Sequence, residues 1–79
     1  MTRDSDNPSL ADPRPAFGRR LAEARRAAGL SQEALAHETG MARSYLGGVE
    51  RGKRNISLVN ICRLASALNM RPGDLLSSL

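Results

Sequence analysis

Apolar residues recur at helical spacing along the chain from residue 16 onward. Phe17, Leu21, Ala24 and Ala28 follow one another at intervals of three or four residues. This spacing places them on one face of an α-helix, in which 3.6 residues complete a turn. The pattern therefore predicts a first helix over residues 16–28 with one buried face.

Two shorter apolar segments follow, and each predicts a short helix. Leu35 lies in the segment QEALAHET, residues 32–39, and Leu46 lies in residues 42–51. The linker TGM contains Gly40, which suits the end of a helix and a tight turn. We therefore expect two helices, joined by a short turn, that direct these leucines into a common core.

The C-terminal third predicts two more helices. Asn55 or Ser57 can cap a fourth helix. We expect its inward positions to be Leu58, Ile61, Leu64, Ala65 and Leu68. Pro72, at the start of the segment PGDLLSSL, suits the first position of a short fifth helix. Because no segment alternates as a strand does, the sequence predicts an all-α domain of five helices.

The first fifteen residues differ from the rest in composition. They contain three prolines and few large apolar side chains. Such a segment buries too little surface to offset the entropy lost on ordering. We therefore predict a flexible tail over residues 1–15 and a helical domain over residues 16–79.

The charge is also divided between these two parts. Residues 1–15 hold two arginines against three aspartates, whereas residues 16–79 hold ten Lys and Arg against five Asp and Glu. A small domain with such a basic excess suggests a polyanionic partner, usually nucleic acid. A merely soluble basic surface is the alternative.

Several classes of protein are disfavoured by composition. Cys62 and His37 are the single cysteine and histidine, so no internal disulfide, zinc cluster or serine–histidine triad is expected. We expect Cys62 to pack in the core, buried or half-buried. No apolar run is long enough to span a membrane, and the N-terminus lacks the apolar stretch of a signal peptide. We expect a cytoplasmic protein that is no enzyme, with no metal, cofactor or small-molecule effector.

The expected helix pair over residues 32–51 has the form of a helix-turn-helix. Two short helices, a tight turn with Gly40 and a basic second helix describe this motif. Its second helix enters the DNA major groove and reads base edges with its N-terminal residues. A helix hairpin alone is weak evidence, and the apolar spacing across the whole segment strengthens it.

Residues 16–76 resemble the phage-repressor and Cro type of helix-turn-helix domain. The segments GLSQEALA, VERGKRN and LASAL carry the resemblance. Within that family, ARSYLGGVERGKRNISL and the early end of the chain are most similar to the controller proteins of restriction–modification systems. The resemblance implies a compact, five-helix, lambda-repressor-like fold. It also implies a homodimer that binds a near-palindromic DNA operator and regulates its own gene together with the endonuclease gene.

Three alternatives stay open. A prophage-type repressor or an antitoxin can share the same domain, and a protein-interaction module can keep the fold without reading DNA. RNA polymerase is a candidate further partner of a regulator of this kind.

The start of the helix over residues 42–51 holds the expected base readers. Arg43 can bond guanine O6 and N7 together, and Ser44 can reach a base or a phosphate. Tyr45 can bond a phosphate or pack against a thymine methyl, or it can rest half-buried against the preceding helix. Ala42 departs from the serine or threonine usual at this cap, so the helix can begin without a side-chain cap.

Further residues are expected to hold the DNA backbone. Gln32 opens the preceding helix, and the resemblance implies that it bonds a phosphate and braces the second helix. A basic loop follows, made of Arg51, Lys53, Arg54 and Asn55. Such contacts set affinity and register rather than sequence preference.

Two adjacent glycines interrupt the presumed recognition helix. Gly47 and Gly48 should each cost about 1 kcal/mol relative to alanine in a helix interior. Gly48 lies one turn beyond Ser44, so we expect it to leave the DNA-facing surface bare and to let the helix approach the bases.

The remaining candidates are structural. Arg25 and Glu50 resemble a family pair that bridges the first helix to the end of the third. The C-terminal apolar residues should exceed what the small core can cover, so a patch should remain for a symmetric dimer. The expected dimer residues are Met70, Leu75, Leu76 and Leu79.

Overall fold

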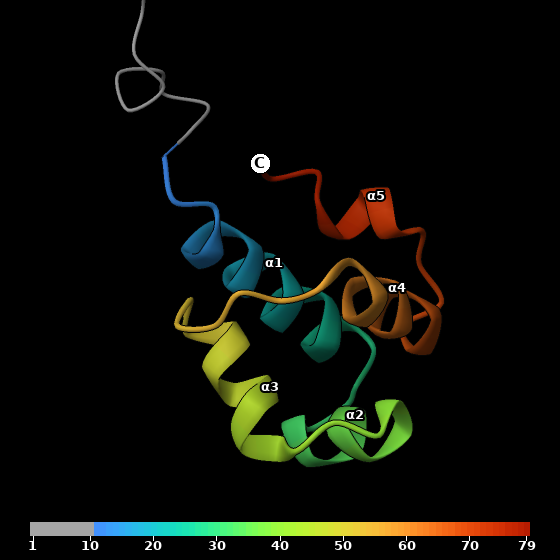
Figure 1. The fold of residues 1–79 in the computed structure, drawn as a ribbon. Coiled ribbons are helices and arrows are strands. Elements are labelled where there is room, and N and C mark those ends of the chain that lie inside the picture. Colours follow the sequence, from blue (N-terminus) through green and yellow to red (C-terminus); the bar gives the residue numbers. More distant parts are fainter. Residues whose placement is uncertain (1–10) are drawn as a thin grey trace, which may run out of the picture.

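The computed structural model describes residues 11–79, and it contains five helices in that range (Figure 1). Their bounds are α1 (Arg14–Ala27), α2 (Gln32–Thr39), α3 (Arg43–Glu50), α4 (Leu58–Ala67) and α5 (Pro72–Leu75). The described residues form no strand, so the expected all-α fold of five helices is confirmed.

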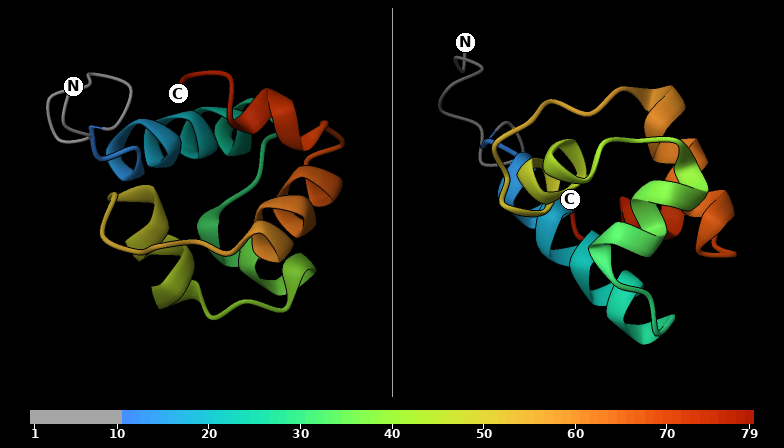
Figure 2. Two further views of the ribbon diagram at one scale, coloured as in Figure 1. Left: turned by 45° about the horizontal axis from the view of Figure 1, so that its top comes forward. Right: turned by 90° about the horizontal axis from the view of Figure 1, so that it is seen from below.

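The five helices enclose the core as a ring. Helix α1 contacts α3 and α5, while α2 contacts α3 and α4, and α4 in turn contacts α5. Figure 2, left, shows this ring with α1 on one side and the α2–α3 pair opposite α5. The arrangement leaves one surface of α3 and the loop after it at the edge of the molecule.

Each helix places one fully buried leucine in the core. These side chains are Leu21, Leu35, Leu46, Leu64 and Leu75, and each is 0% exposed. Burying a leucine side chain contributes about 1.5–3 kcal/mol relative to leaving it in water. Leu75 therefore belongs to the monomer core, and its expected place in a dimer patch was wrong. The side chain of Leu75 holds the four-residue helix α5 against the core.

The helix ends follow the expected chemistry. Ser31 and Ser57 cap α2 and α4, where their side chains accept the backbone N–H of Ala34 at 3.0 Å and of Asn60 at 3.1 Å. Ala42 gives α3 no side-chain cap. Gly40 has φ +71°, a left-handed conformation that costs glycine little, and it turns the chain sharply between α2 and α3.

Helix α1 begins at Arg14, two residues before the boundary expected for the tail. Pro15 stands in its first turn, where the missing N–H of proline costs nothing. Asp12 accepts hydrogen bonds from the Arg14 backbone and guanidinium, which lowers the pKa of Asp12 to about 2. The expected tail was therefore wrong at its end, and residues 1–10 lie outside the described residues.

Two side chains of α4 face solvent against expectation. Leu58 is 69% exposed because it stands in the first turn, and Ile56 of the preceding segment packs against the core instead. Cys62 is exposed as well, since it is rotated by about 100° from the buried Ile61. The buried face of α4 is therefore narrower than the run of apolar residues in its sequence suggests. Ala28 is likewise exposed, just beyond the end of α1.

Candidate nucleic-acid interface

The N-terminal end of α3 presents polar side chains to solvent. Arg43 and Ser44 are exposed in the first turn, directly after the turn from α2. Because Ala42 supplies no cap, the first backbone N–H groups of α3 keep their capacity to bond an anion. This is the geometry that the helix-turn-helix interpretation requires of a recognition helix.

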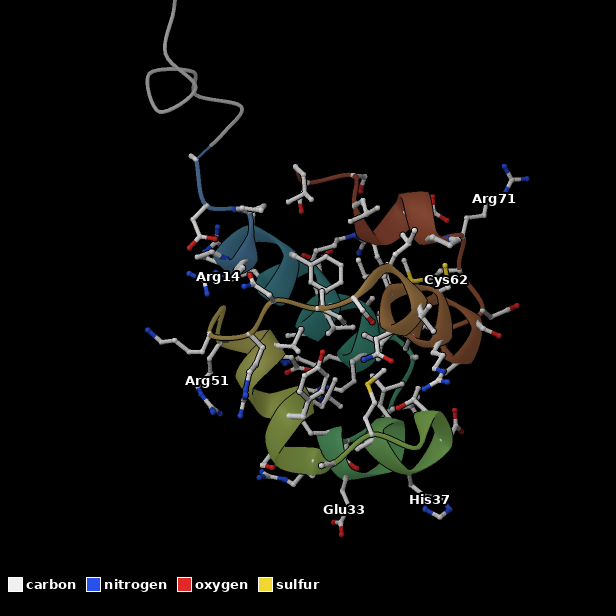
Figure 3. The ribbon with its side chains drawn as sticks, in the orientation of Figure 1. Arg14, Glu33, His37, Arg51, Cys62 and Arg71 are labelled. Carbon is white, nitrogen blue, oxygen red and sulfur yellow. The ribbon has the colours of Figure 1, made fainter. Side chains whose placement is uncertain are left out.

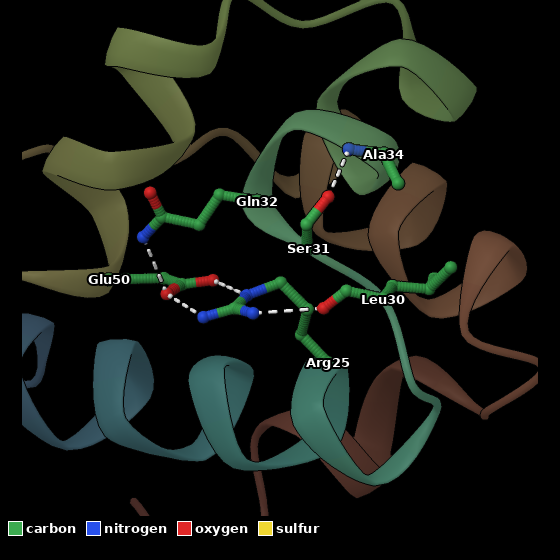
Figure 4. Close-up of polar contacts among 6 residues, drawn as sticks. All are labelled: Arg25, Leu30, Ser31, Gln32, Ala34 and Glu50. Carbon is green, nitrogen blue, oxygen red and sulfur yellow. Dashed lines mark hydrogen bonds and ion pairs between the residues drawn. The ribbon is translucent and has the colours of Figure 1, made fainter.

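The other end of α3 is fixed by an ion pair (Figure 4). Arg25 of α1 donates to both carboxylate oxygens of Glu50, from Nε at 2.7 Å and from Nη2 at 3.0 Å. Its Nη1 donates to the Leu30 carbonyl at 2.9 Å, so one guanidinium ties together α1, α3 and the segment before α2. The structure thus contains the Arg25–Glu50 pair that the resemblance implied.

Gln32 completes this brace. Its side-chain Nε2 donates to Glu50 Oε1 at 2.9 Å, which ties the start of α2 to the end of α3 (Figure 4). The bracing role expected of Gln32 is therefore present. The expected phosphate contact stays a prediction.

The brace also sets the charge state of its members. Burial alone would raise the pKa of Glu50, but hydrogen bonds from Arg25 and Gln32 outweigh it and lower that pKa below its ordinary value. The same hydrogen bond to Glu50 raises the pKa of Arg25. Both groups are therefore charged at neutral pH, and each neutralises the other within the structure.

Tyr45 is half-buried and packs against the core. Its hydroxyl accepts a hydrogen bond from Asn60 Nδ2 of α4 at 3.4 Å. The half-buried position was one of the alternatives for Tyr45, but its hydrogen-bond partner lies on α4 and not on α2. The Arg54 guanidinium carbon lies 5.9 Å from the ring centroid, within cation–π range. Tyr45 thus links α3 both to α4 and to the basic loop.

The two glycines of α3 are covered by side chains. A Cβ on Gly48 would lie 2.9 Å from Cγ of Arg54, and a Cβ on Gly47 would lie 3.1 Å from Nη1 of Arg51. The surface at Gly48 is therefore occupied rather than bare. Our expectation of an uncovered helix face was wrong for the free protein, because a side chain from the loop fills it.

The loop after α3 carries positive charge that no carboxylate of residues 11–79 neutralises in an ion pair. Arg51, Lys53 and Arg54 are all exposed, as is Asn55. Among residues 11–79 the ion pairs join Asp12 to Arg14, Arg20 to Glu23 and Arg25 to Glu50. None of them involves a cation of the loop or Arg43. Figure 3 shows Arg51 projecting from the end of α3, far from Arg71 beside α5.

The four expected dimer residues separate into three groups, of which the fully buried Leu75 is the first. Met70 and Leu76 are half-buried against the core, and Leu79 is 59% exposed. Val59, at 61% exposed, and Leu58 add apolar surface at the start of α4 that our sequence analysis missed. The missed signal was available, because Val59 does not fit the inward stripe of α4.

Two features are absent from the described part of the chain, namely a metal-binding cluster and a membrane-spanning helix. Residues 11–79 contain no cluster of His, Cys, Asp and Glu side chains that could hold a metal ion. In the same range, no helix is both long enough and apolar enough to cross a membrane.

Residues 21–75 match the family model described as helix-turn-helix. The chain belongs to this family. Control protein C.BamHI of Bacillus amyloliquefaciens is 43% identical over 61 residues, which cover 76% of this chain and 75% of that protein. The resemblance to restriction–modification controllers is therefore confirmed.

Solved structures agree with this assignment. The structure of the restriction-modification controller protein C.AhdI from Aeromonas hydrophila has 61% sequence identity and a TM-score of 0.76, and the match covers 77% of this chain and 92% of that chain. The regulator SinR, whose structure is a complex with DNA, has 31% identity and a TM-score of 0.73 over 76% of this chain and 97% of its own. The fold is thus shared with a protein solved on DNA.

Proposed function

We propose that this protein is a homodimeric, sequence-specific transcription regulator and the controller of a restriction–modification system. It binds a near-palindromic operator upstream of its own gene and regulates that gene together with the endonuclease gene. One observation carries the proposal: a recognition helix is braced at its C-terminal end, while Arg43 and Ser44 stand exposed at its N-terminal end.

Each part of the α2–α3 pair has a task in this proposal. Helix α3 enters the major groove, where Arg43 bonds a guanine and Ser44 a base or phosphate. Gln32 and the loop residues hold the phosphates on either side. The brace matters because a readout by hydrogen bonds requires the helix to hold one orientation relative to the rest of the domain.

The homodimer is supported by the apolar surface left over from the core. Leu58, Val59 and Leu79 are the large apolar side chains that residues 11–79 leave exposed. A two-fold dimer would bury such surface and present two recognition helices about 34 Å apart, one turn of DNA. Val59→Asp should yield monomers in sedimentation experiments, since its side chain lies outside the core. An unchanged dimer would place the interface elsewhere.

Site selection from randomised DNA, followed by gel shifts over a salt series, tests the function. We expect one palindromic consensus, with affinity that falls linearly in log salt as counterions are released. Arg43→Ala should relax base preference at one position of each half-site. Arg71→Ala removes the same charge beside α5, at the other end of the molecule, and should leave the consensus unchanged.

A protein-interaction module is the competing function. Absence of binding to any selected or promoter DNA at low salt would favour it. A DNA binder that controls only phage or toxin genes would instead be a prophage-type repressor or an antitoxin. The identity to C.AhdI and C.BamHI supports the controller over both. A reporter gene behind the endonuclease promoter distinguishes the controller from the other two regulators, because only the controller should change its expression. RNA polymerase is the candidate further partner at that promoter.

A further inference from the structure

The exposed surface of α3 has side chains in its first turn and none in its second. Residues four apart share a helix face, so Gly47 lies below Arg43 and Gly48 lies below Ser44. A recognition helix would ordinarily extend its contacts through these second-turn positions. Here the helix itself contributes only backbone there.

Two arginines from beyond the helix fill these positions. Arg51 brings Nη1 to Gly47, where the side-chain Oε1 of Gln32 would also lie 3.6 Å from a Cβ. The Arg54 side chain crosses Gly48, where Nε would lie 3.3 Å from a Cβ. It continues to the Tyr45 ring, one turn toward the start of α3. A Cβ at Gly48 would lie closer to Arg54 Cγ than van der Waals contact allows, whereas a Cβ at Gly47 would displace the tip of Arg51 by a few tenths of an ångström.

We propose that Gly47 and Gly48 are positioning residues, which seat Arg51 and Arg54 on the DNA-facing surface of α3. The two loop side chains take the place of the missing second-turn side chains before DNA binds. The inference rests on the proposed function, because it assigns the seated arginines to DNA contact. In this proposal the helix face at the two glycines is not bare, because the side chains of Arg51 and Arg54 cover it.

We call the surface that each glycine offers to an arginine side chain its seat. The two seats explain why α3 contains two residues of low helix propensity. A long arginine side chain in a loop has many rotamers, and fixing it on binding costs conformational entropy. A side chain already lying in a fitted groove, with its guanidinium over an aromatic ring, has lost part of that freedom in the free protein. Alanine at either glycine would improve the helix. At Gly48 it would force the Arg54 side chain out of its place, and at Gly47 it would shift the tip of Arg51.

A double-mutant cycle separates a seat from a bare surface. Arg54→Ala should lower affinity of the dimer for the selected site about a hundredfold, because each protomer loses one charge-assisted contact that contributes about tenfold. Gly48→Ala should weaken binding as well, although its urea midpoint should rise. If Gly48 acts through Arg54, the double variant loses no more than Arg54→Ala alone. If Gly48 is bare so that DNA can approach, the losses multiply, and the inference is overturned.

Gly47→Ala with Arg51→Ala forms a second, independent cycle with the same expectation. Gly73→Ala is the matched control, because it also places alanine in a helix and its Cβ would meet nothing within 4 Å. It should leave DNA affinity unchanged. A loss from Gly73→Ala equal to that from Gly48→Ala would show that the effect is not local to α3.

The seat can also be measured without DNA. Tyr45 is the single tyrosine of a chain without tryptophan, so its fluorescence and ring resonances report on the surroundings of this one ring, which include Arg54. We expect Gly48→Ala and Arg54→Ala to change these signals alike, and Gly73→Ala to leave them unchanged. Nuclear Overhauser effects should join the Gly48 α-protons to the Arg54 γ-protons in the wild type. Their absence overturns the seat, whereas a wild type that shows them but binds no DNA overturns the proposed function.

Discussion

Arg25 and Arg54 both lie against α3, and the structure uses them in opposite ways. Arg25 reaches from α1, is 9% exposed and holds both oxygens of Glu50. Arg54 comes from the loop, is exposed and lies over Gly48 and Tyr45 without a carboxylate partner among the described residues. One arginine fixes the helix within the fold, and the other keeps its charge available.

The difference follows from where each charge meets solvent. A buried guanidinium needs a partner, because removing an unpaired charge from water costs several kcal/mol. An exposed guanidinium keeps its hydration, so it needs no carboxylate partner and remains free to bind a phosphate. Because Glu50 is committed to Arg25, it does not cancel the positive charge of the loop that begins at the next residue.

Breaking the buried pair should have the largest effect. Glu50→Ala leaves Arg25 buried and uncompensated, and removes the partner of Gln32 as well. We expect the free energy of unfolding to fall by about 3 kcal/mol, measured by urea denaturation. Glu38→Ala, at an exposed position of α2, should change it by less than about 0.5 kcal/mol. Equal losses in the two variants would mean that the brace adds nothing.

The fold was largely predictable because it follows from local patterns. Helical spacing located all five helices, and Ser31, Ser57 and Pro72 marked three of their starts. The errors came from burial that depends on neighbours. Leu75 and Cys62 both lie in apolar segments, yet α5 closes onto the core through the first and α4 turns the second outward.

The brace at the end of α3 was predictable from the sequence, but the geometry of the loop that follows it was not. The resemblance implied the Arg25–Glu50 pair, and the structure contains it. The positions of Arg51 and Arg54 over the two glycines could not be read from the sequence, because the path of a loop side chain depends on the assembled helices. The sequence marks Gly47 and Gly48 as unfavourable in a helix, and the structure places Arg51 and Arg54 against them, as the proposed positioning role requires.

A smaller change keeps both charges of the buried pair but removes the bidentate hydrogen bonding of the Arg25 guanidinium. Arg25→Lys retains one ion contact with Glu50 but loses the two-pronged geometry and the bond to the Leu30 carbonyl. We expect a loss of about 1–2 kcal/mol in unfolding free energy, smaller than that of Glu50→Ala. Because α3 loses its fixed orientation, base discrimination should weaken more than the affinity for non-specific DNA. Competition gel shifts against random DNA measure that ratio, and an unchanged ratio would show that the brace serves stability alone.

The ion pair should also appear in the pH dependence of stability. The pKa of Glu50 is lowered in the folded protein, so its contribution is fully present above the unfolded value and is lost as pH falls through the folded value. Wild-type stability should therefore decline more steeply below about pH 4.5 than that of Glu50→Gln. Asp12 titrates in both proteins, so the difference isolates Glu50. Parallel curves in urea titrations at several pH values would contradict the role of Glu50.

Lys53→Ala changes the exposed side of the comparison and should have the smallest effect on stability. Its side chain lies in solvent, so the unfolding free energy should move by less than about 0.5 kcal/mol. Its effect should appear on DNA, where each lost phosphate contact lowers the slope of log affinity against log salt by about 0.9. A dimer loses two such contacts, whereas Arg71→Ala beside α5 should leave the slope unchanged. Lys53 has no glycine seat, so its loss should weaken all sequences alike and show no coupling to Gly47 or Gly48. Coupling of Lys53 to either glycine would mean that the seats act on the whole loop rather than on Arg51 and Arg54.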